Sequence, residues 1–402
     1  MQPRPLAPRP ASGPFFTTPA QRTQLARERF FEQGQRPTGM VGEAVLQSWT
    51  RCLGAGLQPQ QRPEFEPVTR ARTKAVLERS HPLLQAAAPE VHQLDAMLAG
   101  TGCKSLLTDR EGIVVHATPA GSGAGALLDT IGRIGVYLGE PNFGSTAPGI
   151  SLSTGLDSTV AGAEHFFGVL QQLHCAAAPV RDREGRMAGV LDLSIQGGPF
   201  AFDALALVRQ CVTVIENRLF AAQSAREVML CFQASPALLG TPLEGRVAVT
   251  EDGRVVGLNA AGAQLLRPAP DGGTPDVETL LGMTVGTLHR LLQSRAPAPH
   301  RLPSGLRLWM RAEPPACRHV AVPRVAGDDG ADAGADTDAG ATVPRRNSIA
   351  PPPQTPSLRA VSDQLIEDTL RQCGGNVAKA ARTLGVSRGL LYRRRRPAAQ
   401  PA

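Results

Sequence analysis

Four residues whose side chains could do chemistry lie close together in the middle of the sequence: Glu164, His165, His174 and Cys175. Glutamate and histidine bind divalent metal ions, and a thiol beside an imidazole can become a nucleophile. Their spacing matches no known set of metal ligands, and a reactive thiol must be accessible and have a low pKa. We therefore expect these residues to line a pocket. A metal-dependent enzyme is the alternative that the cluster leaves open.

A glycine-rich run, Gly121-Ser122-Gly123-Ala124-Gly125, has the composition of a phosphate-binding loop. Such a loop also needs a lysine that contacts the phosphates. The chain has three lysines, Lys74, Lys104 and Lys379, and none of them follows a glycine. We expect an ordinary loop here. We predict no catalytic residues, no metal, no cofactor and no enzymatic activity.

Positive charge gathers at the C-terminal end of the chain. From Arg371 onward there are eight Lys or Arg residues and no Asp or Glu, whereas the whole chain has 42 basic and 35 acidic residues. The chain before Arg371 is therefore close to neutral. A basic terminal element on a neutral body indicates nucleic acid as the partner, rather than a membrane.

Composition indicates a cytoplasmic protein with a folded core. Hydrophobic residues make up 42% of the sequence. No apolar run approaches the ~20 residues that a membrane span needs, and residues 1–21 lack the apolar stretch of a signal peptide. The seven cysteines are scattered without any Cys-x-x-Cys, which is typical of reduced thiols in the cytoplasm.

The basic end has the pattern of three short helices. Asn376 can cap a helix with apolar residues at i, i+3, i+4 and i+7, Gly385 follows that helix, and Ser387 can cap the next one. Two helices joined by a tight turn make a helix-turn-helix, whose second helix meets DNA bases. We predict that DNA is contacted by Asn376, Ser387, Arg388, Gly389, Tyr392, Arg393, Arg394, Arg395 and Arg396. The alternative is a solvated basic tail.

Other elements must hold the pocket residues in place. Residues 105–116, 178–194 and 247–259 each follow the pattern strand, Asp- and Gly-containing turn, strand. An apolar stripe from Phe202 to Phe220 predicts a long helix packed on a sheet, with a dimer contact as the alternative. Residues 327–341 are almost only Gly, Ala and Asp, which predicts a flexible linker.

The segment Gly375–Arg393 resembles the Fis-type helix-turn-helix of bacterial enhancer-binding activators of sigma-54 RNA polymerase. Its elements Gly375-Asn376, Ala380-Ala381, Leu384–Arg388 and Leu391–Arg393 occur in the order and at the spacing of that module. The resemblance implies binding to a double-stranded DNA operator. Because one recognition helix reads only a half-site, we expect a dimer.

The body resembles the sensor of the acetoin-catabolism regulator group in the segments Ser48–Cys52, Gly162–Phe166, Cys175–Val180 and Gly189–Ser194. In that group, residues of this kind form a GAF domain, which senses a small molecule. Two positions depart from the group: Thr146 stands where Asn is usual, and Tyr137 where Trp is usual. The resemblance implies an effector site that includes Tyr137, Glu140, Thr146, Glu164, His165 and Cys175.

Members of the sigma-54 activator family usually carry an AAA+ ATPase between the sensor and the DNA-binding module. Here the linker occupies that place, and neither a GxxxxGK[ST] motif nor the Gly-Ala-Phe-Thr-Gly-Ala loop that contacts sigma-54 occurs in the sequence. The resemblance therefore implies a regulator that cannot activate sigma-54 polymerase alone.

Residues 243–320, which include Val247–Arg254 and Asn259–Ala261, resemble the PAS-like segment that follows the sensor in the acetoin-catabolism regulator group. Together with these resemblances, the sequence predicts an α+β protein with a GAF-type antiparallel sheet and flanking helices, a PAS-like α+β segment and an all-α helix-turn-helix. The expected parts are a disordered N-terminus (1–21), a helical region (22–79), the GAF-type sensor (80–226), the PAS-like domain (243–320), a disordered linker (321–357) and the Fis-type module (358–396).

The predicted function is a transcriptional regulator whose sensor, on binding a small-molecule effector, controls DNA binding. The expected partners are operator DNA, a second copy of the chain, and RNA polymerase or a full-length relative. The alternative is an interaction protein that titrates full-length relatives through mixed dimers.

Overall fold

The computed structural model describes residues 18–119, 125–267, 275–294 and 296–316, together with Arg371, Asn376 and Val377. The chain divides into two units, residues 1–322 and 323–402. The architecture below is that of the first unit. The predicted linker and all predicted DNA contacts except Asn376 lie outside the described residues, as do residues 1–17 and most of the glycine-rich loop.

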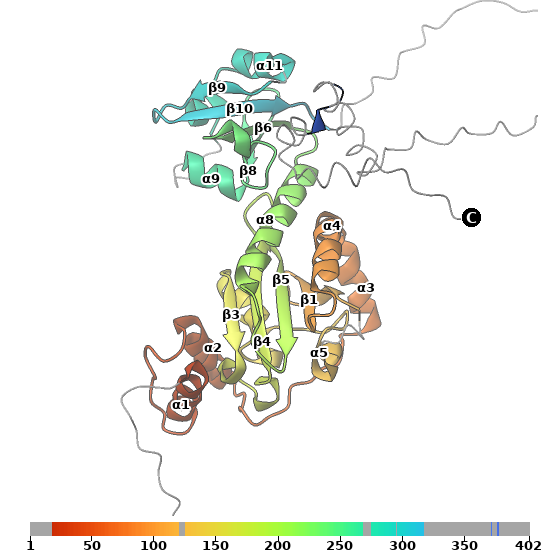
Figure 1. Cartoon of the computed structure of the whole chain (residues 1–402), viewed down its shortest axis with the longest axis vertical. Helices are drawn as coiled ribbons and strands as arrows, with labels where there is room; N and C mark the ends of the chain where they lie inside the picture. The colour runs from red at the N-terminus through yellow and green to blue at the C-terminus, as the bar shows by residue number, and fades with distance from the viewer. Residues whose placement is uncertain are drawn as a thin grey trace, which may run out of the picture. The chain divides into compact units, whose positions relative to one another are not determined.

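The first sheet has five antiparallel strands in the order β2-β1-β5-β4-β3. Figure 1 labels β1, β5, β4 and β3 of this sheet. The strands are β1 (Cys103–Asp109), β2 (Val114–Ala117), β3 (Ser158–Ala161), β4 (Leu173–Arg181) and β5 (Met187–Gln196). The predicted hairpins at 105–116 and 178–194 are confirmed as β1–β2 and β4–β5.

The two hairpin turns share the sequence Asp-Arg-Glu-Gly, and the first residue of each turn organises it. Asp109 Oδ1 accepts hydrogen bonds from the amides of Glu111 (3.0 Å) and Ile113 (2.9 Å). Asp182 Oδ1 accepts the corresponding pair, from Glu184 (3.0 Å) and Arg186 (2.8 Å). Gly112 and Gly185 have positive φ, as a tight turn of this kind requires.

Helices cover both faces of the first sheet. On one face, α4 (His81–Leu98) and α8 (Ala204–Gln223) bury an apolar core against β1, β4 and β5. Helix α8 is the predicted helix over 202–220. The opposite face lies under α2 (Glu43–Gly54), α5 (Ala126–Ile131), α6 (Glu140–Phe143) and α7 (Ala147–Thr154). The remaining elements of this part are α1 (Pro19–Phe31), α3 (Arg70–Arg79) and the 3-10 turns η1 (Gly162–Glu164) and η2 (Gly168–Leu170).

Helix α1 begins at Pro19, inside the segment 1–21 that the composition suggested to be disordered. Thr18 caps it by accepting a hydrogen bond from the Gln21 amide, and Pro19 suits the first helical position because its missing N–H would have no partner there.

The second sheet is also five-stranded and antiparallel, in the order β8-β7-β6-β10-β9. Its strands are β6 (Val228–Gln233), β7 (Gly245–Val249), β8 (Val255–Leu258), β9 (Ala298–Arg301) and β10 (Arg307–Glu313). The third predicted hairpin is confirmed as β7–β8. The central strand β6 precedes the segment 243–320 in which we expected this domain.

One face of the second sheet holds its own apolar core, which α10 (Val277–Leu281) and α11 (Val285–Ser294) close. Helix α9 (Ala260–Leu266) contacts β7 and β8, and η3 (Pro236–Leu238) follows β6. On the other face, Phe220 at the end of α8 packs against Met229, Cys231 and Ala248. Helices and antiparallel sheets together confirm the predicted α+β class. Within the residues described above, no helix is both long and apolar enough to cross a membrane.

Candidate functional site

The face of the first sheet under α2, α5, α6 and α7 carries several buried polar side chains. Side chains alternate along a strand, and Leu191 and Leu193 of β5 belong to the core under α4 and α8. Asp192 and Ser194 therefore lie on the opposite face. Strand pairing and burial give the set that we call the polar face: Lys104, Thr108, Cys175, Asp192 and Ser194.

The predicted residues His165 and Cys175 meet at one end of the polar face. His165 is fully buried, and its Nε2 lies 3.4 Å from the Cys175 Sγ. Its Nδ1 lies 3.0 Å from the carbonyl oxygen of Gly162, which fits an Nδ1–H donor and leaves Nε2 to accept from the thiol. Burial lowers the pKa of His165 to about 4 and raises that of Cys175 well above its ordinary value. Both groups are therefore neutral near pH 7, an arrangement suited to hydrogen bonding rather than to nucleophilic attack.

Ser194 continues this network to Asp192. The Ser194 hydroxyl lies 3.1 Å from the Cys175 Sγ and 2.7 Å from Asp192 Oδ2, to which it donates. Asp192 is fully buried, and burial raises its pKa to about 7. A row of four side chains, His165, Cys175, Ser194 and Asp192, thus crosses the sheet.

Two buried polar atoms of the polar face lack a hydrogen-bond partner within the described residues: Asp192 Oδ1 and Thr108 Oγ1. Thr108 pairs with Val190 and Leu106 pairs with Asp192, so the two side chains are diagonal neighbours on adjacent strands. Leaving such a buried group unpaired costs about 1–3 kcal/mol. Each of the two atoms therefore has room in its bonding capacity for one further hydrogen bond.

Lys104 is the cation of the polar face, and it already has a partner. Its side chain is 1% exposed, and its Nζ lies 2.8 Å from Asp129 Oδ1 on α5. A side chain at Gly132 would collide with the Lys104 Cε, so the glycine allows α5 to approach the sheet. The ion pair fixes α5 and neutralises Lys104, which disfavours an anion at this face.

Glu140, another predicted effector contact, binds α2. Its carboxylate accepts hydrogen bonds from the Ser48 hydroxyl (2.6 Å) and from Arg51 Nε (2.7 Å) and Nη2 (2.6 Å). Ser48 also lies 2.6 Å from the Ser145 hydroxyl. These bonds attach α2 to the segment that begins α6 and α7.

The other three predicted effector contacts also bond within the protein or lie elsewhere. Thr146 caps α7 by accepting from the Gly149 amide (3.1 Å), and Glu164 accepts from the Ala161 amide (2.9 Å). Tyr137 is half-buried and packs with the core on the α4 and α8 side. Of the six residues, the structure brings only His165 and Cys175 into contact with the polar face. The effector contacts of all six residues stay predictions.

Arg27 of α1 supports the loop that carries His165. Its guanidinium is almost fully buried and donates to the carbonyl oxygens of His165 (2.6 Å), Phe166 (2.5 Å) and Ala163 (3.3 Å). It also lies 4.7 Å from the centroid of the Phe31 ring. Burial lowers the pKa of Arg27 to about 10. The Trp49 indole of α2 donates to the Glu164 carbonyl oxygen in the same loop (2.7 Å).

Two surface pockets, of about 220 and 230 Å³, lie away from the polar face. The first is between the β1–β2 and β4–β5 turns and the end of α8, and the second is between α1 and the end of α2. In the part of the chain that the structure describes, no three His, Cys, Asp or Glu side chains gather closely enough to hold a metal ion.

Sequence reasoning missed Asp192, Ser194, Thr108 and Lys104. Asp192 and Ser194 lie in the segment Gly189–Ser194, which resembled the sensor group, but they were not singled out there as binding residues. The available signal was an Asp between Leu191 and Leu193 in an apolar strand, because a charged residue is almost never fully buried without a role or a partner.

Known proteins resemble this chain in two segments. Residues 18–212 match the model of the MimR N-terminal domain, and residues 357–396 match the model of the Fis family of bacterial regulatory proteins. The acetoin catabolism regulatory protein of Cupriavidus necator is 32% identical over 302 residues, which cover 70% of this chain and 44% of that protein. The propane 2-monooxygenase operon transcriptional activator MimR of Mycolicibacterium smegmatis is 30% identical over 212 residues, or 52% of this chain and 35% of that protein.

The chain thus spans less than half the length of these curated relatives. Among solved structures, the E. coli DhaR(N)–DhaL complex aligns with a TM-score of 0.42 and 16% identity, over 68% of this chain and 100% of that chain. Residues 18–212 are thus similar to the MimR N-terminal domain and residues 357–396 to the Fis family, and the two named relatives are a regulatory protein and a transcriptional activator.

Proposed function

We propose that this protein is a DNA-binding transcriptional regulator in which a small molecule at the polar face controls a Fis-type helix-turn-helix. The observation that carries the proposal is the Fis-family match at residues 357–396, in the segment that holds the basic run Arg393–Arg396. A helix-turn-helix reads one half-site, so we expect a dimer on a two-fold symmetric operator.

The direct test is selection of DNA by the purified chain from a random pool. The expected result is one enriched site with two half-sites, bound far more tightly than unrelated duplexes. Enrichment of no sequence, with equal affinity for all duplexes, would contradict a role as a sequence-specific regulator.

The effector is proposed to bond to Asp192 Oδ1 and Thr108 Oγ1, with His165 and Cys175 at the far end of the same row. Both atoms are buried and lack a partner within the described residues. A ligand hydroxyl or amide would therefore offset the free-energy cost of these unpaired buried groups. Burial keeps Asp192 partly protonated near pH 7, and Lys104 is paired with Asp129, so an uncharged polar molecule fits better than a carboxylate.

A thermal-shift screen of small alcohols, ketones and organic acids on the full chain tests the effector site. A ligand at 100 times its Kd stabilises the folded state by about 2.7 kcal/mol. We expect Thr108→Val and Asp192→Asn to weaken the response to a hit. The control is Thr213→Val on α8, whose hydroxyl donates to the Arg209 carbonyl on the protein surface. A hit to which all three variants respond like the wild type would refute this site.

We also propose that the chain does not hydrolyse ATP and cannot by itself remodel sigma-54 polymerase, because no lysine follows a glycine in its sequence. Purified protein should show no ATP turnover above background, with or without DNA. Turnover that co-purifies with the chain through successive columns would contradict this.

A second candidate function is titration of full-length relatives through mixed dimers. It is favoured by the match to the Cupriavidus necator regulator, because the aligned residues are 70% of this chain and only 44% of that protein. Specific operator binding by the purified homodimer favours direct regulation, whereas binding only in mixtures with a relative favours titration.

A further inference from the structure

Helix α8 takes part in two hydrophobic cores. Val208, Val212 and Ile215 are buried in the core of the first sheet, whereas Phe220 is buried against Met229, Cys231 and Ala248 of the second sheet. The chain passes from the end of α8 at Gln223 to the start of β6 at Val228 in four residues. The helix therefore packs against both sheets.

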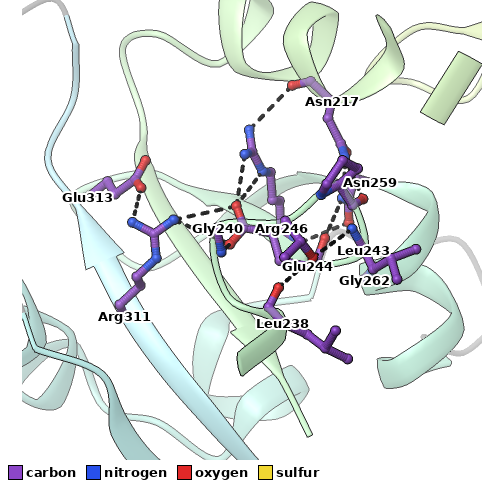
Figure 2. A network of polar contacts seen from close by, with 12 residues as sticks. Asn217, Leu238, Gly240, Leu243, Glu244, Arg246, Asn259, Gly262, Arg311 and Glu313 are labelled. Atoms are coloured by element: carbon purple, nitrogen blue, oxygen red, sulfur yellow. Dashed lines mark hydrogen bonds and ion pairs between the residues drawn. The ribbon is translucent and has the colours of Figure 1, made fainter. Parts of the chain in front are cut away.

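Asn217, in the second half of α8, uses both ends of its side-chain amide to bond to residues beside the second sheet; Figure 2 shows Asn217 next to Asn259. Its Nδ2 donates to the Pro242 carbonyl oxygen (2.8 Å), and its Oδ1 accepts from Asn259 Nδ2 (2.7 Å). Arg246 Nη1 donates to the backbone oxygen of Asn217 (3.4 Å). Two segments of the second body, by which we mean the second sheet with its helices and loops, thus hold one residue of α8: residues 242–246 and Asn259.

The groups that hold Asn217 are themselves fixed. Asn259 Oδ1 accepts from the amides of Arg246 and Gly262, both at 2.8 Å, and so caps α9. The remaining guanidinium nitrogens of Arg246 bond to Glu244, a fully buried carboxylate that also accepts from the Gly240 amide (2.6 Å) and from Arg311. Figure 2 shows this network reaching from Asn217 to Arg311 on β10.

The carboxylate of Glu244 stays ionised despite its burial. Burial alone would raise its pKa, but the Gly240 amide and the guanidinium groups of Arg246 and Arg311 outweigh burial and hold the pKa below its ordinary value. The network is therefore a charged and fully bonded support, in which each member limits the movement of the next.

A second set of bonds holds the end of α8 to the first sheet. In the β4–β5 turn, the Arg183 amide donates to Gln223 Oε1 (2.9 Å) and its Nη1 donates to the Gln223 backbone oxygen (2.6 Å). Arg183 Nη1 also lies 3.7 Å from Glu227 Oε1, just before β6. The connection from α8 to β6 is thus bonded to the first sheet through Arg183, in addition to the bonds of Asn217 to the second body.

We infer that Asn217 couples the two bodies, so that α8 and the second sheet move as one unit and a change in the core of the first sheet reaches the second sheet through this residue. The inference goes beyond the proposed function and does not depend on it, because the coupling is a property of the ligand-free chain. Asn217 is a positioning residue in this scheme and need not contact an effector.

Amide hydrogen exchange on the full chain, with and without Asn217→Ala, tests the coupling. The variant removes both side-chain bonds, so we expect amides of β6, β7 and β8 to exchange at least tenfold faster while amides of β1, β4 and β5 keep their wild-type rates. The matched control is Asn142→Ala, which removes amide bonds to the carbonyls of Glu64 (3.0 Å) and Tyr137 (3.4 Å) inside the first body. The control should leave the second sheet unchanged.

The variant Val208→Ala, which leaves a cavity in the core of the first sheet, tests directly whether a change in that core reaches the second sheet. In the wild-type background it should speed exchange in β6–β8 as well as in the first sheet, and in the Asn217→Ala background it should speed exchange in the first sheet alone. An equal effect on β6–β8 in both backgrounds would overturn the inference. So would a uniform acceleration of both sheets by Asn217→Ala.

If Asn217→Ala fails to fold, Asn217→Asp is the second variant. It keeps the acceptor for Asn259 and loses the donor to Pro242. We expect its second sheet to exchange faster than in the wild type, with an unchanged first sheet. Wild-type exchange throughout in Asn217→Asp would count against the coupling role of this side chain.

Discussion

Burial acts in opposite directions on the two titrating side chains in the row that crosses the first sheet. It raises the pKa of Asp192 to about 7 and lowers that of His165 to about 4. Between these values the folded state holds a proton on Asp192 that an unfolded chain releases, and lacks a proton on His165 that an unfolded chain binds. The contribution of Asp192 to stability therefore grows on acidification, while that of His165 shrinks, and the two partly cancel.

Substituting Asn for Asp192 should expose the effect of His165. The amide in Asp192→Asn cannot titrate, so the variant loses the gain on acidification and keeps the loss from His165. We expect the free energy of unfolding of Asp192→Asn, relative to the wild type, to decrease as the pH falls from about 7 to about 4. Urea unfolding at a series of pH values measures the difference. A difference that is constant across this range would show that Asp192 does not titrate with a raised pKa.

Arg27 should contribute measurably to the free energy of unfolding, because its guanidinium holds the loop that carries His165. Arg27→Ala leaves the carbonyl oxygens of His165 and Phe166 without this donor, and an unpaired buried group costs about 1–3 kcal/mol. The control is Arg29→Ala on the same helix, an exposed residue that contacts Met40 Sδ and should change stability by less than about 0.5 kcal/mol. Equal midpoints for the two variants in urea unfolding would contradict the role given to Arg27.

At the level of single residues, the sequence supported the contact between His165 and Cys175 but not the rest of their row. Two such residues that are ten positions apart suggest a common site, whereas Asp192 and Thr108 come from different strands. Their proximity depends on the register Leu106–Asp192 and Thr108–Val190, which long-range strand pairing sets. Glu140 shows the reverse case: a carboxylate that looked available in the sequence is bonded to Ser48 and Arg51.

At the level of elements, strong local signals made three hairpins and the long helix α8 predictable. The Asp-Arg-Glu-Gly turns specify β1–β2 and β4–β5 by bonds within the turn itself, and the apolar stripe of α8 follows the helical period. The short helices α5 and α6 have too few residues to show a period. Strand β6 is apolar on both faces, because Phe220 of α8 covers the face opposite to the main core, and so it lacks the alternation of a half-buried strand.

Helix α2 lies in the region 22–79 that we expected to be helical, and the structure shows what its apolar face covers. Val45, Leu46, Trp49 and Cys52 are buried in the core shared with β4 and β5, and the Trp49 indole bonds to the loop before η2. The segment 22–79 and the segment 80–226 thus contribute to one core. Burying a large side chain contributes about 1.5–3 kcal/mol, so several such side chains affect whether the sheet folds at all.

A fragment of residues 80–226 should therefore be much less stable than a fragment of residues 18–226. We expect the longer fragment to unfold cooperatively in urea and the shorter one to bind a hydrophobic dye and to lack a sharp transition. Trp49→Phe in the longer fragment is a milder test, because it retains most of the buried area and removes the bond to Glu164. Equal stability of the two fragments would mean that α2 is an addition to an independent domain.

At the level of the whole molecule, DNA recognition was predicted from charge, from helix signals and from the resemblance to the Fis-type module. It rests on residues 357–396, for which the family match is the available support. The proposed module divides its arginines by role. Arg388 directly follows Ser387, the predicted cap, so it would lie in the first turn of the recognition helix, where side chains meet base edges. An arginine that bonds to both acceptors of a guanine discriminates against other bases by about 1–3 kcal/mol.

Arg393–Arg396 should instead supply affinity without sequence information. Four successive residues exceed one helical turn, so they cannot all face the same groove, and some must meet phosphates. Replacing one phosphate-bound arginine with Ala should weaken binding to specific and random duplexes by the same factor and lower the salt slope of binding by about 0.9. Arg388→Ala should instead weaken binding to the selected site far more than binding to random DNA. Binding isotherms on both duplexes at several salt concentrations measure these effects.

Equal losses of affinity on the two duplexes for Arg388→Ala would exclude Arg388 as the base-reading residue. Unchanged binding after replacement of all four arginines would mean that the basic run is a solvated tail.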